Sequence, residues 1–286
     1  MGKKTMKQIL LLITTLFYLF YHTTLAQSLI FITKEKKSIV YQDIGKGTPL
    51  VLIHAFPTDQ RLWKAQQKEL KKYFRVITLD LWGFGQSQMT DGSAITMTDY
   101  ADEVKQLLDK LQIQKAIIGG ESMGGYIALA FLKKYPNEVK GLILSDTQTI
   151  ADTKEIKAKR EASAIEVLQD GTDHLINGFI PKALSKNAPD KTKMFLQNIL
   201  TSQKAAALAS ALRGMALRED TSNILSTTSL PVLIITGDKD EVISPQQSKT
   251  MKQLAKNSRL VILTNAGHLS SLEQSSKWNQ AVINMY

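Results

Sequence analysis

The chain has 286 residues, 43% of them hydrophobic, and a formal net charge of +10. This length and composition suit one globular domain with a substantial core, with room for an insertion. Cysteine is absent, which excludes disulfides and thiolate metal sites, and the four histidines are too scattered to form a zinc motif.

Residues 1–26 have the pattern of a secretory signal peptide. Three lysines precede the apolar stretch 9–21, and small residues ending at Ala26 form a cleavage site. The apolar stretch has 13 residues, whereas a membrane span needs about 20. We therefore expect cleavage after Ala26, export to the periplasm or the medium, and no stable membrane insertion afterwards. An uncleaved signal that acts as an anchor is the alternative.

The charge pattern of the mature chain does not indicate a nucleic-acid partner. Removing residues 1–26 takes away three lysines and no acids, so the net charge falls from +10 to +7. The remaining basic residues are mixed with acids, as in 68–72, which is typical of solvated helix faces. Basic and aromatic residues do not alternate as they do in nucleic-acid-binding segments. A small-molecule substrate is the expected partner.

Strand and helix patterns alternate through most of the chain, which predicts a parallel sheet with helices on both faces. The apolar or alternating runs predict strands over residues 29–33, 38–42, 50–54, 75–80, 116–118, 140–145, 231–236 and 259–263. Helical spacing of apolar residues predicts helices over residues 61–72, 98–111, 126–132 and 245–256, and one more at the C-terminus.

The alternation stops in residues 149–229, where apolar residues recur only at helical intervals. About 80 residues without a strand are too many for a loop. We interpret this segment as a helical cap inserted into a core formed by residues 27–148 and 230–286.

The most informative stretch joins the strand at 116–118 to the following helix. It reads GGESMGG, which matches the G-x-S-x-G pattern of a nucleophile elbow centred on Ser122. Such a turn holds its central residue in a strained conformation, and Gly120 and Gly124 stand where a side chain would collide. The start of the helix directs unpaired N–H groups at any anion formed near Ser122.

Two later strand ends carry the residue types that a serine nucleophile needs. Asp240 follows the strand at 231–236, and His268 follows the strand at 259–263. The carboxyl ends of parallel strands lie along one edge of a sheet, so Ser122, Asp240 and His268 are expected to meet there. Their order is that of α/β-hydrolases: nucleophile, acid, histidine.

With these motifs, the chain resembles proteins of the α/β-hydrolase fold, close to the esterase and 3-oxoadipate enol-lactonase-like branch. The resemblance covers essentially the whole mature chain and is weakest in the cap. It rests on the segments HAFPTD, DLWGFGQS, GESMGGYIALA, PVLIITGDKDEVISP and NAGHLSSLE. Together these segments are specific for the fold and much less specific for the substrate.

The residue chemistry and the resemblance assign a role to each site residue. His268 would remove the proton from Ser122 and later protonate the leaving group, and Asp240 would orient the imidazole. The resemblance implies that the backbone N–H groups of Phe56 and Met123 form the oxyanion hole. Each such donor contributes on the order of 3 kcal/mol in comparable sites.

Two points stay open in the sequence. In some relatives the acid follows the preceding strand, which would make Asp146 the partner of the histidine in place of Asp240. Trp82, Phe84 and Met215 could line an acyl pocket or belong to the core.

The predicted reaction is hydrolysis of a carboxylic ester or lactone through an acyl-serine, with no metal or organic cofactor required. Enol-lactone hydrolases act in the cytoplasm, so an export signal argues against that particular assignment. Cofactor-free perhydrolases and C–C bond hydrolases share the triad, and a ligand receptor that retains the fold is a different class of function. A surface lipase would need a long apolar lid, and the cap is too charged to suggest one.

Overall fold

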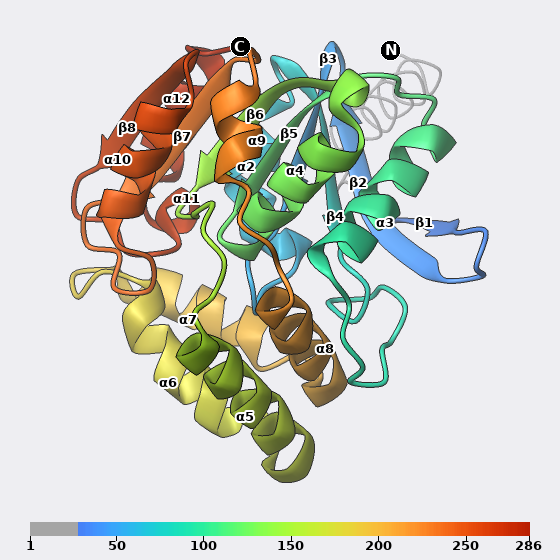
Figure 1. Ribbon diagram of the computed structural model, residues 1–286, viewed down its shortest axis with the longest axis vertical. Coiled ribbons are helices and arrows are strands. Elements are labelled where there is room, and N and C mark those ends of the chain that lie inside the picture. The colour runs from blue at the N-terminus through green and yellow to red at the C-terminus, as the bar shows by residue number, and fades with distance from the viewer. Residues whose placement is uncertain (1–27) are drawn as a thin grey trace, which may run out of the picture.

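The computed structural model describes residues 28–286, so the predicted signal peptide and its cleavage site lie outside the described part. The structure is organised around one eight-stranded sheet in the order β1-β2-β4-β3-β5-β6-β7-β8 (Figure 1). The first two strand pairs, β1–β2 and β2–β4, are antiparallel. All later pairs are parallel, so the carboxyl ends of β3 to β8 share one edge.

The eight strands fall close to the ranges expected from the sequence. Their bounds are β1 Leu29–Ile32, β2 Ser38–Gly45, β3 Thr48–Ile53, β4 Phe74–Asp80, β5 Ala116–Glu121, β6 Val139–Ser145, β7 Val232–Gly237 and β8 Ser258–Leu263. Two strands run three residues beyond the predicted range: β2 continues to Gly45, and β5 continues past its apolar run because its glycines pair with both neighbouring strands.

Helices cover both faces of the sheet. On one face lie α3 (Met97–Lys110), α4 (Met123–Lys134) and α10 (Pro245–Leu254), with α4 against β5 and α10 against β7. The other face carries α2, α11 and α12 and the short 3-10 helix η1. Their bounds are η1 Gln60–Trp63, α2 Lys64–Leu70, α11 Ser270–Glu273 and α12 Ser275–Ile283.

Alternation along the central strands fills two cores, one on each face. In β3, Val51 and Ile53 join the cluster beneath α3 and α4, whereas Leu50 and Leu52 join the cluster beneath α2 and α12. All four side chains are fully buried. A strand buried on both faces explains the unbroken apolar run in the sequence.

Five helices lie between β6 and β7. They are α5 Lys154–Asp170, α6 Asp173–Ala183, α7 Asp190–Leu200, α8 Ala205–Ala216 and α9 Ser222–Thr227. The first four stand beyond the carboxyl edge of the sheet, with α5 packed along α8 (Figure 1). The last, α9, instead contacts α4 and α10, and its Leu225 is buried in the core. The predicted cap, residues 149–229, includes α9, but in the structure α9 packs on the sheet domain.

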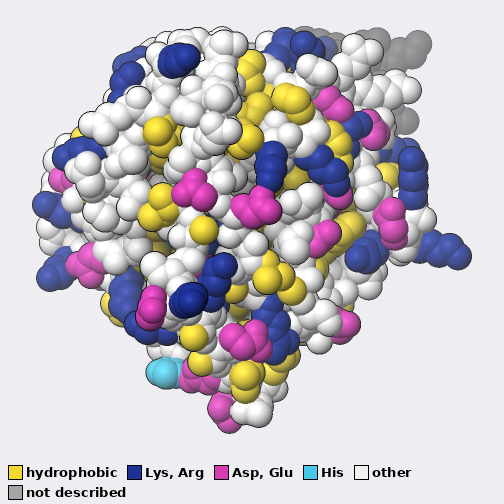
Figure 2. Space-filling model, in the orientation of Figure 1, with side chains coloured by type: hydrophobic (Ala, Val, Ile, Leu, Met, Phe, Trp, Pro, Cys, Tyr) yellow, Lys and Arg dark blue, Asp and Glu magenta, His cyan; other side chains and the backbone are white. Residues whose placement is uncertain are grey.

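The predicted architecture is confirmed: a mostly parallel sheet carries helices on both faces, and a group of helices is inserted between β6 and β7. Across residues 28–286, every helix is too short or too polar to traverse a lipid bilayer. On the face drawn in Figure 2, basic and acidic side chains are interspersed over the surface.

Candidate active site

Ser122 lies at the turn between β5 and α4, in the strained geometry of a nucleophile elbow. Its φ is 54° and its ψ is −115°, a conformation that residues with a Cβ rarely adopt. The backbone around it is fixed, because its N–H donates to Ser145 O at 2.8 Å and its carbonyl accepts from Thr147 Oγ1 at 2.8 Å. The side chain makes no capping bond to α4, which leaves Oγ available for another partner.

The elbow is packed backbone against backbone, which only glycine permits. A Cβ on Gly124 would lie 2.1 Å from Ile53 O, and a Cβ on Gly120 would lie 2.1 Å from the carbonyl carbon of Gly124. These neighbours are main-chain atoms and cannot move aside as a flexible side chain could.

We expect Gly124→Ala to destabilise the protein by about 3 kcal/mol or more, because β3 and α4 would have to separate. Urea unfolding checks this. Gly178→Ala is the matched control, since a Cβ there meets no atom within 4 Å. In a helix interior, that change should be neutral or stabilising by up to about 1 kcal/mol. Equal effects of the two variants would contradict this account.

The structure brings Ser122, His268 and Asp240 together. His268 Nε2 lies 2.8 Å from Ser122 Oγ, and His268 Nδ1 lies 2.9 Å from Asp240 Oδ2. The other carboxylate oxygen of Asp240 accepts the N–H groups of Val242 and Ile243, each at 2.8 Å. Ser122 and His268 are 8% and 1% exposed. The carboxylate is therefore held in place, and it can fix the imidazole with Nε2 free to accept the serine proton.

The alternative acid, Asp146, does not contact the imidazole in a hydrogen bond. Its carboxylate accepts from Gly237 N at 2.8 Å, from Ser145 Oγ at 2.9 Å and from Ser270 Oγ. Burial, and then the neighbouring charge of Glu121, raises its pKa well above the ordinary value. Asp146 thus braces β6 against β7 beneath the site, and the geometry favours Asp240 as the partner of His268.

The backbone N–H groups expected in the oxyanion hole are available. Met123 is the first residue of α4, and Phe56 follows β3 at the same edge of the sheet. Within residues 28–286, neither N–H donates to a protein acceptor. Phe56 and Ser122 line the same cavity. Free main-chain donors beside a nucleophile suit the stabilisation of a developing oxyanion.

A cavity of about 180 Å³ opens at Ser122 and His268. Cap residues form much of its wall, including Phe179 from α6 and Met215 from α8, for which the sequence left pocket and core open. Trp82 and Phe84 do not line it. Phe84 is fully buried and packs edge-on against His54 and Phe56, and Trp82 belongs to the same core cluster. Of the two alternatives that the sequence left open, these two aromatic residues belong to the core, and Phe84 also supports the loop that carries Phe56.

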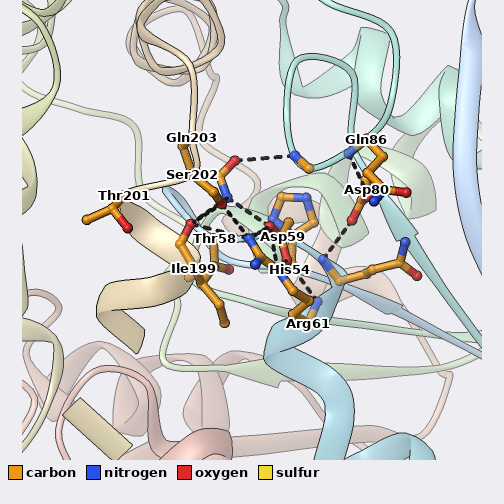
Figure 3. A network of polar contacts seen from close by, with 12 residues as sticks. His54, Thr58, Asp59, Arg61, Asp80, Gln86, Ile199, Thr201, Ser202 and Gln203 are labelled. Atoms are coloured by element: carbon orange, nitrogen blue, oxygen red, sulfur yellow. Dashed lines mark hydrogen bonds and ion pairs between the residues drawn. The ribbon is translucent and has the colours of Figure 1, made fainter. Parts of the chain in front are cut away.

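A network of polar contacts ties that loop to the cap (Figure 3). Asp59 accepts three hydrogen bonds from the Arg61 guanidinium and one from Gln203 Nε2 at 2.8 Å. Arg61 also reaches Ser202 Oγ at 2.5 Å, and Gln203 Oε1 accepts from Gly85 N at 3.3 Å. The turn between α7 and α8 is thereby joined to the loops after β3 and β4.

His54, at the base of the same loop, is a fully buried neutral residue. Its Nε2 accepts the Leu81 N–H at 3.1 Å, so Nδ1 carries the proton and donates to Ala55 O at 3.0 Å. Burial lowers its pKa from an ordinary value of 6.5 to about 4. Protonation would remove the acceptor that Leu81 uses.

This pKa predicts a loss of stability at acid pH. Between pH 6.5 and 4 the unfolded chain binds a proton at residue 54 that the folded chain excludes, so the free energy of unfolding falls as the pH falls. We expect the wild type to lose about 2–3 kcal/mol more than His54→Gln between pH 7 and 4.5 in urea titrations. Equal losses in the two proteins would contradict the buried neutral state.

No group of three potential metal ligands occurs among the His, Asp and Glu side chains of residues 28–286.

Sequence reasoning missed Asp152 and Arg160, two charged cap residues that line the catalytic cavity. Arg160 stands in a helix rich in charged residues, a pattern typical of a solvated surface, and Asp152 lies just before that helix.

A buried Ser–His–Asp array at the carboxyl edge of a sheet covered on both faces defines the class of α/β-fold hydrolases. Comparison with known proteins agrees: residues 48–275 match the alpha/beta hydrolase fold family, and the chain belongs to it.

Relatives of known sequence and structure extend over nearly the whole chain. It is 31% identical over 265 residues to AB hydrolase superfamily protein YisY of Bacillus subtilis, covering 87% of this chain and 96% of that protein. It is 27% identical to 3-oxoadipate enol-lactonase 1 of Acinetobacter baylyi, covering 88% and 94%. A thermophilic esterase of Thermogutta terrifontis, solved with malate bound, has a TM-score of 0.87 at 33% identity, covering 91% and 97%.

Proposed function

We propose that the protein is a serine hydrolase that cleaves small to medium carboxylic esters or lactones through an acyl-serine intermediate. The observation that carries the proposal is the hydrogen bond between His268 Nε2 and Ser122 Oγ, 2.8 Å long, with Asp240 on the far side of the ring. The esterase and enol-lactonase among the similar proteins support the same class of reaction.

In the proposed mechanism, a group of the site takes part in each step of acyl transfer. As Ser122 Oγ attacks the ester carbon, its proton passes to His268 Nε2, and Asp240 stabilises the imidazolium. The N–H groups of Phe56 and Met123 bind the oxyanion. His268 then protonates the departing alkoxide, which leaves an acyl-serine. The same imidazole then takes a proton from a water molecule, whose oxygen attacks the acyl carbon. The imidazolium returns this proton to Ser122 Oγ as the ester bond to the serine breaks and the acid leaves.

The cavity size favours a short acyl group. Its volume of about 180 Å³ lies below the roughly 300 Å³ at which pockets for drug-sized ligands begin. A second hollow of about 470 Å³ shares Phe56, Phe179 and Val242 with it and extends over α6 toward His174. We assign the larger hollow to entry of the substrate.

Turnover of 4-nitrophenyl esters by the purified mature protein tests this function. We expect steady multiple turnover of the acetate and butanoate esters and a steep decrease in kcat/KM toward the hexadecanoate. Faster cleavage of the long chain would favour a lipase. A single slow burst, with ligand-dependent stability in its place, would identify a receptor that retains the triad.

We further propose export of the protein without stable membrane insertion. The support is the sequence of residues 1–26, with its lysines, its short apolar stretch and its small residues before Gln27. N-terminal sequencing after expression with the native leader should give Gln27 as the first residue in the exported fraction. Full-length protein retained in the cell would contradict this proposal.

A further inference from the structure

The catalytic cavity has a charged wall, which an ester hydrolase for purely apolar acyl groups does not require. Asp152, in the loop before α5, and Arg160, on α5, line the cavity together with Ser122. Arg218 follows α8 and does not line the cavity, but it forms an ion pair with the carboxylate of Asp152. Asp152 and Arg218 are buried, with side chains 1% and 4% exposed, and the Arg160 side chain is 20% exposed.

One aspartate oxygen serves both arginines. Asp152 Oδ2 accepts from Arg160 Nε at 2.5 Å and lies 2.7 Å from Arg218 Nη1. Burial alone would raise the pKa of Asp152, but the hydrogen bond from Arg160 and the charges of both arginines outweigh it, and its pKa lies below the ordinary value. The aspartate is thus ionised, and the three side chains carry a net charge of +1.

The two arginines differ in how many of their donors are already used. Arg218 also donates to Met215 O at 3.3 Å and to Ile150 O at 3.0 Å, and it stacks on Tyr126 with its guanidinium carbon 4.2 Å from the ring centroid. These contacts give Arg218 a structural role.

Arg160 uses only one of its guanidinium nitrogens, Nε, in a strong hydrogen bond. Apart from Nε, its only contact is from Nη1 to the weak acceptor Sδ of Met215 at 3.5 Å, and Nη2 has no hydrogen-bond partner among residues 28–286. A guanidinium with two free donors on one edge matches the two oxygens of a carboxylate.

We propose that Arg160 is a carboxylate-binding residue of the catalytic cavity, and that the substrate is an ester or lactone that carries a free carboxylate. This inference rests on the hydrolase function proposed above. Arg218 neutralises Asp152, so that Arg160 keeps its positive charge for the substrate. One arginine would be enough to pair with Asp152 in a purely structural role. The second arginine gives the cluster of Asp152, Arg160 and Arg218 its net positive charge. The acid released would then be a dicarboxylic acid, or the alcohol released would carry the carboxylate.

Two pairs of matched substrates test the proposal. With the carboxylate on the acyl side, 4-nitrophenyl hydrogen glutarate is compared with 4-nitrophenyl pentanoate. With the carboxylate on the alcohol side, the butanoate ester of 4-hydroxybenzoate is compared with that of 4-hydroxybenzamide. We expect the wild type to prefer the anionic member of at least one pair in kcat/KM. Arg160→Gln should lower kcat/KM for that member about 10- to 100-fold, the effect of losing a charge-assisted bidentate contact, and leave the neutral member within about threefold.

The variant should fold, because Asp152 retains Arg218 as its partner. Arg213→Gln is the matched control: Arg213 is a cap arginine paired with Glu161, and it does not line the catalytic cavity. It should change neither pair of substrates. No preference for an anion in either pair, or an equal loss on neutral and anionic esters in Arg160→Gln, would overturn the proposal.

A binding measurement separates this inference from the hydrolase function. In Ser122→Ala, calorimetry with glutarate should show binding at millimolar concentration, and Ser122→Ala/Arg160→Gln should show none. Glutarate binding that depends on Arg160, in a wild type that turns over no ester, would retain the anion site and reject the hydrolase. Ester turnover without anion preference or glutarate binding would retain the hydrolase and reject the anion site.

Discussion

Ser122→Ala is expected to lower kcat for 4-nitrophenyl butanoate by about 10⁴- to 10⁶-fold, the range found when the nucleophile of a serine triad is removed. The reason is that Ser122 is the one residue among 28–286 whose hydroxyl forms a hydrogen bond with His268 Nε2, at 2.8 Å, so its removal takes away the nucleophile that forms the acyl-enzyme. KM should change little, because the cavity wall stays intact. Stopped assays at high enzyme concentration give the residual rate.

The same position provides a control against unfolding. Ser122 holds a φ of 54°, and the backbone strain of such a residue is on the order of 1–3 kcal/mol. Ser122→Gly should therefore be as inactive as the alanine variant and more stable than the wild type by about 1 kcal/mol. A glycine variant that is less stable would contradict the strained elbow, and one that retains activity would reject Ser122 as the nucleophile.

Asp240→Asn is expected to lower kcat about 10⁴-fold, the effect of the corresponding change in a well-studied serine triad. An amide can donate to His268 Nδ1, which would leave the proton on Nε2 and remove the base. The variant should still fold, because the N–H groups of Val242 and Ile243 can bond to the amide oxygen as they bond to Oδ1 now. Steady-state kinetics near neutral pH measure the loss.

Asp146→Asn is the matched control for the acid. Asp146 lies beneath the triad and accepts from Ser270, Ser145 and Gly237, but it makes no hydrogen bond to the imidazole. Because burial already favours its neutral form, the isosteric amide should cost less than about tenfold in kcat. A larger loss in Asp146→Asn than in Asp240→Asn would reverse the assignment of the acid.

The sequence predicted the sheet well because its central strands are buried on both faces and leave unbroken apolar runs, as β3 does. The triad could be placed because the carboxyl ends of parallel strands lie at one edge of the sheet. It was enough to see that Ser122, Asp240 and His268 each follow a predicted strand. Neither inference requires knowledge of how the cap folds.

The pocket could not be predicted in the same way. Trp82 and Phe84 have the residue types of a pocket lining, but the loop after β4 turns them into the core. Arg160 stands in a charged helix, and only the packing of α5 along α8 brings it to Asp152 and the cavity. Similarly, α9 has the helical pattern of the cap, and only its contacts with α4 and α10 place it on the sheet domain.

The most direct test of the central claim is covalent labelling with a fluorophosphonate, followed by intact mass measurement and peptide mapping. Our account predicts one adduct per chain, located on Ser122, which forms far more slowly in His268→Gln and does not form in Ser122→Ala. A folded wild-type protein that takes up no label, or that carries the label on another serine, would contradict it.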